Sequence, residues 1–540
     1  MRNALSMLVL AALAIVVPSA VAQPPVRTPG EQTEFRRYTQ SQDVWAFLET
    51  VSAASRRVRV HVVGKTAAAK DFPATDIYLA VITENSAETP AELDRKKPTI
   101  LVLASQHGNE HSGKEAALTL IRDLAVGDLK PLLQQVNVLV MPQTNPYGNS
   151  VDKRPNEQGL DLNRDHVKLE SPETRAIHAV FTRWMPEVSL DLHEKGDDYY
   201  QVNTGCVTNA NIAAAIRRFS MDTIFKETEA YVKANGSTWH EYLVTEAMGS
   251  QGAAGAPEPA DEARRETLTR PSTTDLNDGR NGLGIYETIS FIQEGASRHD
   301  IPTLQGRTTY QYLGVKALLR SVADHAAQVL QVVNSSRAAL LKKAQAPAAT
   351  DLVHLRMVHA RDPKQPEITV QAFEPPPAGD AVPSSAGAPK VVSRVVKNWF
   401  PAVEPTVSVP RAYGYIIPAA RSAVVDVLRA HGIAVQTFTA AADLEVEQYR
   451  VAEVKPASED YVAPETIAVT KATVTVKVQP GDVYVSGAQP AANLIPNLLE
   501  PQAEFGLIRY QAFKLVPEKG DLFPFLRVAK KQGLPLTAGK

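Results

Sequence analysis

Short apolar runs alternate with amphipathic segments along the first 345 residues of the chain. Uninterrupted apolar runs rich in Val, Ile and Leu are typical of buried strands, and strict alternation of apolar and polar residues is typical of half-buried ones. The expected strands are Val58–Lys65, Asp76–Thr83, Pro98–Gln106, Val136–Pro146, Val188–Glu194 and Ile289–Ala296. Helical spacing of apolar residues predicts the helices Asp43–Ala54, Ser112–Leu124 and Thr308–Lys343. This alternation predicts an α/β fold with a mixed, mostly parallel central sheet.

The pattern changes at Ala344–Thr350, where a segment containing Ala and Pro follows the last helix. Beyond it, strand-like segments dominate, and a short helix is expected to end at Gly432. We therefore expect an α/β domain at residues 23–345 and a smaller, strand-rich accessory domain at residues 351–540, whose role the sequence leaves open. Within the first domain, Met248–Asn281 is rich in Gly, Ala, Pro and charged residues, which predicts a long surface loop.

Residues 1–22 have the layout of a secretory signal peptide. Arg2 precedes an apolar core from Met7 to Val17, and small residues follow up to Ala22. This core is too short to span a bilayer comfortably, and no later segment is apolar enough to cross one. We therefore expect an exported protein, periplasmic or secreted, that is cleaved near Ala22 and has no transmembrane segment in its mature form.

Composition narrows the possible partners and covalent links. The chain has 57 Lys and Arg against 59 Asp and Glu, a formal net charge of -2, so no nucleic acid partner is expected. Cys206 is the only cysteine, which excludes an intrachain disulfide, and we expect it to be a small buried apolar residue. Nothing in the sequence indicates the oligomeric state.

The segment Ser105–Ala117, SQHGNEHSGKEAA, brings metal-binding side chains to the end of an apolar run. His107 and Glu110 are three residues apart where a strand turns into a helix, so both can point at one ion. His193, at the end of another expected strand, is the best third ligand, because sites in open α/β sheets lie at the carboxyl ends of strands. Two histidines and one carboxylate leave a position open for water, which predicts a catalytic site with one Zn²⁺ per chain.

Two neighbouring features allow more than one interpretation. Asp191 lies two residues before His193 on the same strand face, where it is either a hydrogen-bond partner of that ligand or a buried polar residue. His111 and Glu115 are four residues apart and fit a surface pair on the helix better than a ligand role.

Further polar strings follow in a fixed order. Asn145–Gly148 is followed by Arg154, then by Gly159–Asp165 with the sequence GLDLNRD, and then by DLHE, which ends at Glu194. With HGNE ahead of them, these strings resemble the zinc carboxypeptidases of the carboxypeptidase A type over roughly residues 35–340. The resemblance implies an α/β/α sandwich around a mixed eight-stranded sheet.

The resemblance also implies roles for individual residues. The three zinc ligands are matched by His107, Glu110 and His193. Arg154 matches the arginine that helps hold the substrate carbonyl oxygen, and Glu294 matches the general base. Asn163 and Arg164 match the pair that grips the terminal carboxylate of the peptide.

Glu287 is the alternative to Glu294 as general base. Period-two alternation places Ser290, Ile292 and Glu294 on one strand face, and Glu294 lies at the end of the run, where site residues belong. The mobile tyrosine that caps the substrate in the family has no clear match, because Tyr286 is too close to Glu294.

These residues predict a zinc-dependent carboxypeptidase acting on peptides with a free C-terminus. One alternative is a peptidase for peptidoglycan stem peptides, and another is a deacylase of the succinylglutamate desuccinylase or aspartoacylase type. Those deacylases are typically shorter and cytosolic, which the signal peptide disfavours. A catalytically dead binding protein is disfavoured because every candidate group is present. The preferred side chain and the identity of the metal stay open.

Overall fold

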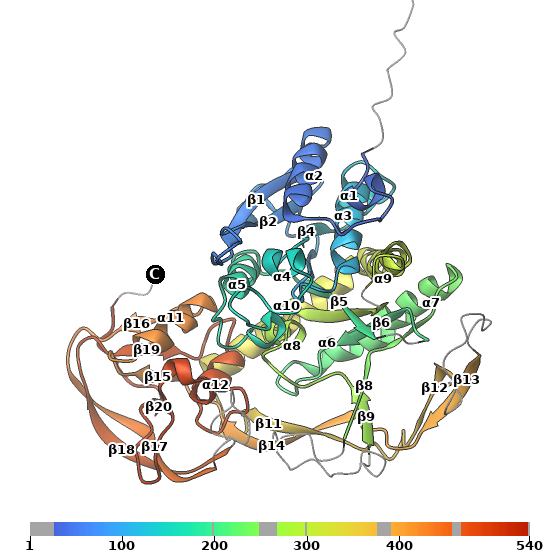
Figure 1. The fold of residues 1–540 in the computed structure, drawn as a ribbon. Helices are drawn as coiled ribbons and strands as arrows, with labels where there is room; N and C mark the ends of the chain where they lie inside the picture. The colour runs from blue at the N-terminus through green and yellow to red at the C-terminus, as the bar shows by residue number, and fades with distance from the viewer. Residues whose placement is uncertain are drawn as a thin grey trace, which may run out of the picture.

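The computed structural model describes residues 26–196, 199–247, 267–297, 300–374, 390–455 and 466–537 (Figure 1). The expected signal peptide at residues 1–22 lies outside these ranges. Within them, no helix is both long enough and apolar enough to cross a membrane.

An eight-stranded mixed sheet lies at the centre of the first 345 residues (Figure 1). The strand order is β1-β2-β4-β3-β5-β10-β6-β7. The bounds are β1 Val58–Lys65, β2 Asp76–Ile82, β3 Thr99–Ala104, β4 Asn137–Met141, β5 Val188–Gly196, β6 Val202–Cys206, β7 Trp239–Glu241 and β10 Ile289–Ser297. Four neighbouring pairs are parallel (β3–β4, β3–β5, β5–β10 and β6–β7) and three are antiparallel, which confirms the expected mixed, mostly parallel sheet.

Helices flank this sheet, and most of them lie in the connections between its strands. The longer ones are α2 Ser41–Ala54, α3 Ser112–Ala125, α5 Pro172–Trp184, α7 Lys226–Ala234, α9 Leu304–Asp324 and α10 Ala326–Gln345. The shorter ones include α1 Pro29–Gln32, α4 Pro146–Ser150, α6 Ala214–Phe219 and α8 Gly279–Gly284. β3 is buried throughout, and α3 is buried at all but one position because it packs against α2, α9 and the sheet. The turn between β3 and α3 is therefore anchored by buried elements at both ends.

The expected single helix Thr308–Lys343 is instead two helices, α9 and α10. They meet at His325, whose φ of -109° and ψ of 23° depart from helical values. The imidazole of His325 contacts Glu227 Oε1 at 2.7 Å and Gln328 Oε1 at 2.6 Å, and these hydrogen bonds hold the break in place.

The expected surface loop Met248–Asn281 contains regular structure at its C-terminal end. Residues 248–266 lie outside the described ranges, but β9 Thr267–Pro271 pairs with β8 Leu243–Ala247. α8 is buried, and its first turn is capped by the Asp278 carboxylate, which accepts a hydrogen bond from the backbone N–H of Asn281 at 2.7 Å. The loop prediction is wrong for these elements, because strand pairing and a helix cap outweigh local composition.

Strands dominate the chain beyond α10, as expected. Two antiparallel pairs form separate two-stranded sheets: β11 Leu352–Ala360 with β14 Ala402–Pro410, and β12 Ile368–Phe373 with β13 Val391–Val396. A six-stranded sheet contains β15 Gly414–Ile417, β16 Gln436–Thr437, β17 Ala442–Lys455, β18 Thr466–Val478, β19 Val483–Ser486 and β20 Leu526–Val528. The helices here are α11 Ser422–Ala430 and α12 Leu494–Leu499. α11 contacts α5, and its Val424 and Leu428 join the same hydrophobic cluster as the first sheet. The domain division at residues 345–351 stays a prediction.

His431, which follows α11, is buried where this part of the chain meets the first. Its Nε2 donates a hydrogen bond to the carbonyl oxygen of Val167 at 2.9 Å, and burial lowers its pKa from 6.5 to about 4. Between these two pH values the unfolded chain binds more protons than the folded protein, so stability falls as the pH falls. We expect this group to remove about 2 kcal/mol of unfolding free energy between pH 7 and pH 5. Urea unfolding at both pH values should show a smaller acid loss for His431→Gln.

His325→Gln is the control of opposite sign. The hydrogen bond that His325 donates to the Glu227 carboxylate raises the pKa of His325, so its contribution to stability is present below the unfolded pKa and is lost as pH rises. The His325→Gln protein should lose at least as much stability on acidification as the unmodified chain. Equal acid losses in the His431→Gln and unmodified proteins would contradict the role given to His431.

Candidate metal centre

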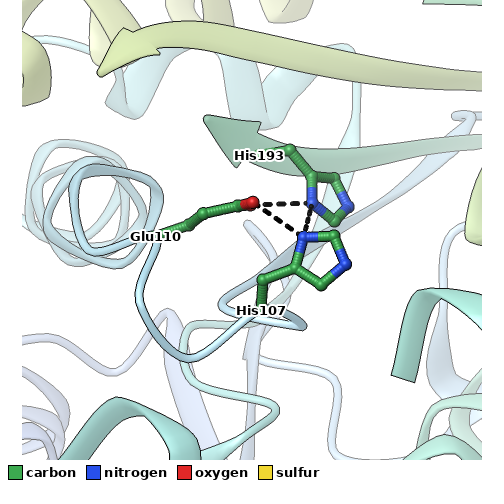
Figure 2. Close-up of side chains that lie close together, drawn as sticks. All are labelled: His107, Glu110 and His193. Carbon is green, nitrogen blue, oxygen red and sulfur yellow. Dashed lines mark hydrogen bonds and ion pairs between the residues drawn. The ribbon is translucent and has the colours of Figure 1, made fainter. Parts of the chain in front are cut away.

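The three predicted ligands converge at the carboxyl ends of β3 and β5, which are parallel neighbours (Figure 2). His193 Nδ1 lies 2.9 Å from Glu110 Oε2 and 3.0 Å from His107 Nδ1. His107 Nδ1 lies 2.7 Å from Glu110 Oε1. The ligand atoms all lie within 4.8 Å of one another, and the three side chains are more than nine-tenths buried.

The turn that presents His107 and Glu110 depends on two unusual backbone positions. Ser105 has a φ of +59°, in the left-handed region. A Cβ at Gly108 would lie 2.0 Å from the carbonyl carbon of Gly148, so only glycine fits this close approach. The side chain of Asn145 donates a hydrogen bond to the carbonyl oxygen of Gln106 at 3.1 Å and holds the turn against α4.

The donor set fits a zinc ion. The second ring nitrogen of each histidine faces a carboxylate: His107 Nε2 lies 3.1 Å from Asp161 Oδ1, and His193 Nε2 lies 2.8 Å from Asp191 Oδ2. Each Nε2 therefore carries the proton and donates it, which leaves a lone pair on each Nδ1. Two imidazole lone pairs and one carboxylate that face one point are the ligands zinc prefers, and the paired carboxylates fix the rings.

The charges of the site shift the pKa of its ligands strongly. Burial raises the pKa of Glu110, but His107 and His193 outweigh it and hold that pKa far below its usual range. Burial lowers the pKa of His193, but the carboxylates of Asp191 and Glu110 outweigh it and raise that pKa well above its usual value. A divalent cation at this point therefore competes with a proton for His193, so metal binding releases protons.

Asp161→Asn should weaken zinc binding, because the amide no longer provides the negative charge that orients His107. We expect an affinity about 10- to 100-fold lower, measured by competition with a chromophoric chelator. Asp152→Asn is the matched control, since Asp152 Oδ1 contacts His111, which is no ligand, at 2.9 Å. Equal zinc affinities of the Asp161→Asn and unmodified proteins would show that Asp161 does not orient His107 for the metal.

The structure places Arg154 and Asn163 beside the candidate ligands. Arg154 is half exposed, lies 3.6 Å from Glu110 Oε1 and donates to Asp161 Oδ2 at 2.9 Å. Asn163 Nδ2 lies 3.3 Å from His193 Nε2, and Asn163 Oδ1 accepts a hydrogen bond from the N–H of Gly279 at 2.7 Å. Both residues therefore border the metal centre.

Arg164 lies in the 3-10 turn Leu162–Arg164 and donates to the carbonyl oxygen of Asn163 at 2.7 Å. Burial lowers the pKa of Arg164, but Asp275, Asp161 and Asp278 outweigh it and raise that pKa. Arg164 is therefore a permanent cation at the edge of the site.

Glu294 lies on β10 directly opposite His193 of the parallel neighbour β5 and opposite Asn203 of β6. Paired residues on neighbouring strands share a sheet face, so its carboxyl group faces the same side as the metal ligand. Burial raises the pKa of Glu294. The charge of His193 opposes this increase, and the charge of Glu110 adds to it. Glu287, the alternative base, lies two residues before β10, where its Oε2 accepts a hydrogen bond from the N–H of Ala213 at 2.9 Å.

Two neighbours of these groups had no role predicted from the sequence, and the predicted environment of a third was wrong. Asp161 was part of the GLDLNRD string but had no assigned role. Tyr242 lies between β7 and β8. The nearby Glu294 carboxylate is the largest cause that raises the pKa of Tyr242, and burial is the second. His111 is fully buried rather than exposed, because Tyr38, which lies between α1 and α2, stacks on it with ring centroids 3.5 Å apart. These contacts join residues that are far apart in the sequence, so no local pattern predicts them.

Residues 44–202 match the zinc carboxypeptidase family, Peptidase M14. The chain is 23% identical to "Carboxypeptidase 2" of Trichophyton rubrum over 517 residues, covering 91% of this chain and 86% of that protein. It is 26% identical to "Carboxypeptidase 2" of Trichophyton tonsurans over 314 residues, covering 55% of this chain and 54% of that protein.

Among solved structures, the chain is similar to the carboxypeptidase A of Helicoverpa armigera. The sequence identity is 14% and the TM-score is 0.40, with 54% of this chain and 75% of that one covered. A metallo-carboxypeptidase from Pseudomonas aeruginosa in complex with (2-guanidinoethylmercapto)succinic acid matches with 18% identity and a TM-score of 0.37, over 53% of this chain and 68% of that one.

Proposed function

Because this chain belongs to the zinc carboxypeptidase family through the part that contains residues 44–202, we propose that it is a zinc-dependent carboxypeptidase that hydrolyses the C-terminal peptide bond of peptides. The observation that carries the proposal is the convergence of His107, Glu110 and His193, with a carboxylate behind each histidine.

His107, Glu110 and His193 would hold the zinc ion. Zinc bound there supplies Lewis acidity, which lowers the pKa of water towards 7 and polarises the scissile carbonyl group. Glu294 accepts the proton of the attacking water on its carboxylate and passes it to the nitrogen of the leaving amino acid. Burial, which raises the pKa of Glu294, suits it to both proton transfers. Arg154 donates hydrogen bonds to the oxygen of the scissile carbonyl as negative charge develops on it.

Asn163 and Arg164 provide the selectivity for the end of the chain. A guanidinium binds a carboxylate through two parallel hydrogen bonds, and a peptide without a free carboxylate cannot satisfy it. Arg164 lies in the same short turn as Asn163, which borders His193, so a C-terminal carboxylate held there places the last peptide bond near the metal ligands. This arrangement supports an exopeptidase.

A mixed peptide pool tests the proposal directly. The purified protein should contain about one zinc per chain. Mass spectrometry should show loss of single C-terminal residues, 1,10-phenanthroline should abolish that loss, and added zinc should restore it. Internal cleavage, release of acyl groups alone, or turnover unaffected by the chelator would each overturn the proposed activity.

We also propose that the protein is exported after cleavage near Ala22, on the strength of the sequence pattern of residues 1–22. N-terminal sequencing of the protein recovered from the periplasm or medium should begin at Gln23. An intact Met1 on the active protein would contradict this proposal.

A further inference from the structure

A buried series of hydrogen bonds runs from the metal ligand His193 deep into the protein. His193 Nε2 contacts Asp191 Oδ2 at 2.8 Å, and the same oxygen accepts a hydrogen bond from Gln106 Nε2 at 2.6 Å. Gln106 Oε1 lies 2.9 Å from His166 Nε2, and His166 Nδ1 lies 3.0 Å from His178 Nε2. All five residues are at least 97% buried, so water does not replace these contacts.

The donors in this series all point towards Asp191. The carboxylate of Asp191 can only accept, so Gln106 must present its NH₂ group there and its oxygen to His166. His166 therefore donates through Nε2 and accepts through Nδ1, and His178 donates through Nε2. Burial lowers the pKa of both His166 and His178, which keeps each ring neutral with one donor and one acceptor. The end of the series is His178 Nδ1, a buried nitrogen without a hydrogen-bond partner among the described residues.

We infer that Gln106, His166 and His178 are positioning residues that fix Asp191, and through Asp191 the ring orientation and tautomer of the metal ligand His193. The inference rests on the proposed zinc site. A carboxylate oxygen that accepts from both His193 and Gln106 is held at two points, so it cannot rotate away from the ligand. His193 then keeps its proton on Nε2 and presents the lone pair of Nδ1 to the metal.

The packing around the series leaves no room for it to move. A Cβ at Gly279 would lie 2.7 Å from Asp191 Oδ2 and 2.9 Å from Gln106 Nε2. A Cβ at Gly282 would lie 2.9 Å from the Cβ of His166. The two glycines of α8 therefore allow the helix backbone to close directly over the three middle side chains.

The C-terminal part of the chain closes the far end. The ring of His431 meets the ring of His178 edge-on, with centroids 4.9 Å apart. His431 is held by the carbonyl oxygen of Val167 and by the hydroxyl of Tyr286, which donates to its backbone oxygen at 2.9 Å. The strand-rich part thus covers the last member of a series that begins at the metal centre.

A purely structural role is the competing explanation, since a satisfied buried polar network also stabilises one arrangement of a core. The two roles differ in what they change. A structural network changes the unfolding of the metal-free protein, whereas a positioning role changes the affinity for zinc and the state of the His193 ring.

The test compares His178→Phe, which removes the donor, with His178→Gln, whose side-chain NH₂ can take the place of Nε2–H. Zinc affinity of the metal-free full chain is measured by competition with a chromophoric chelator. We expect His178→Phe to bind zinc about 10-fold more weakly and His166→Phe about 10- to 100-fold more weakly. His178→Gln should recover most of the affinity, and His354→Phe on β11 should change nothing.

Two further readouts separate the explanations. Nitrogen-15 NMR of the imidazole rings should show the protonated Nε2 of His193 in the unmodified zinc protein and a mixture of states in His166→Phe. Unmodified affinity in a folded His166→Phe protein would overturn the inference, and so would a failure of His178→Gln to restore binding while it restores thermal stability. Failure of the unmodified protein to bind zinc would instead overturn the proposed metal site.

Discussion

Glu294→Gln is expected to lower kcat by about 10³-fold and to leave zinc content and thermal stability unchanged. Glutamine has the same shape but cannot accept a proton, and general-base catalysis typically contributes about 10²- to 10⁴-fold. Glu294 lies opposite His193 on the neighbouring strand but is not among the converging ligands, so its replacement does not remove a metal donor. Steady-state kinetics on a peptide with a free C-terminus, together with elemental analysis, measure both quantities.

The effect should appear in kcat rather than in KM. In the proposed role the Glu294 carboxylate acts on the proton of the attacking water, so the substrate in its ground state would gain little from it. Glu49→Gln is the matched control, because Glu49 is an exposed residue of α2. If the Glu294→Gln protein contains full zinc and keeps an unmodified kcat, Glu294 is not the general base, and Glu287 becomes the next candidate.

The strands and helices that build the site were predictable because their local patterns agree with their tertiary positions. β3 is an almost uninterrupted apolar run and is buried throughout, as such a run implies. β5 alternates apolar residues with Ser189, Asp191 and His193, and it is buried from Val188 to Glu194. The helix break at His325 and the strand β9 were not predictable, because each is decided by a partner distant in sequence. His325 depends on Glu227, and β9 depends on pairing with β8.

The candidate site shows the same division between local and distant information. His107 and Glu110 were predictable from one short string, and His193 from its place at the end of a strand. Asp161 and Gln106 acquire their roles only through contacts with residues 54 and 85 positions away in the chain, respectively. No spacing rule carries such information, so the hydrogen bonds behind the ligands had to come from the fold.

Distance along the chain also explains why the C-terminal part could not be given a role from its sequence. Its strand-like segments were expected, and the Gly432 helix end was expected, with a φ of +71° that favours glycine. Its contact with the series behind His193 depends on the ring of His431 meeting that of His178, 253 positions earlier in the chain. Because the C-terminal part buries the end of this hydrogen-bond series, it has a structural reason to be joined to the catalytic part in one chain.

Arg164→Ala is expected to lower kcat/KM about 10²- to 10³-fold on peptides with a free C-terminal carboxylate. Arg164 is exposed in the structure, so the relevant pair is the one that a bound C-terminal carboxylate would form with it. Removing one partner of a charge pair that is desolvated on binding costs about 2–5 kcal/mol, and each 1.4 kcal/mol or so is about tenfold in rate. Arg164→Lys should recover only part of this loss, because an ammonium keeps the charge but not the two parallel hydrogen bonds.

The decisive comparison pairs each peptide with its C-terminal amide as a competitive inhibitor. The unmodified enzyme should bind the free carboxylate more tightly than the amide, and Arg164→Ala should bring the two inhibition constants close together. Arg183→Ala, at an exposed position of α5, should leave both constants unchanged. If Arg164→Ala weakens peptide and amide equally, Arg164 does not read the carboxylate, and selectivity for the chain end must come from another residue.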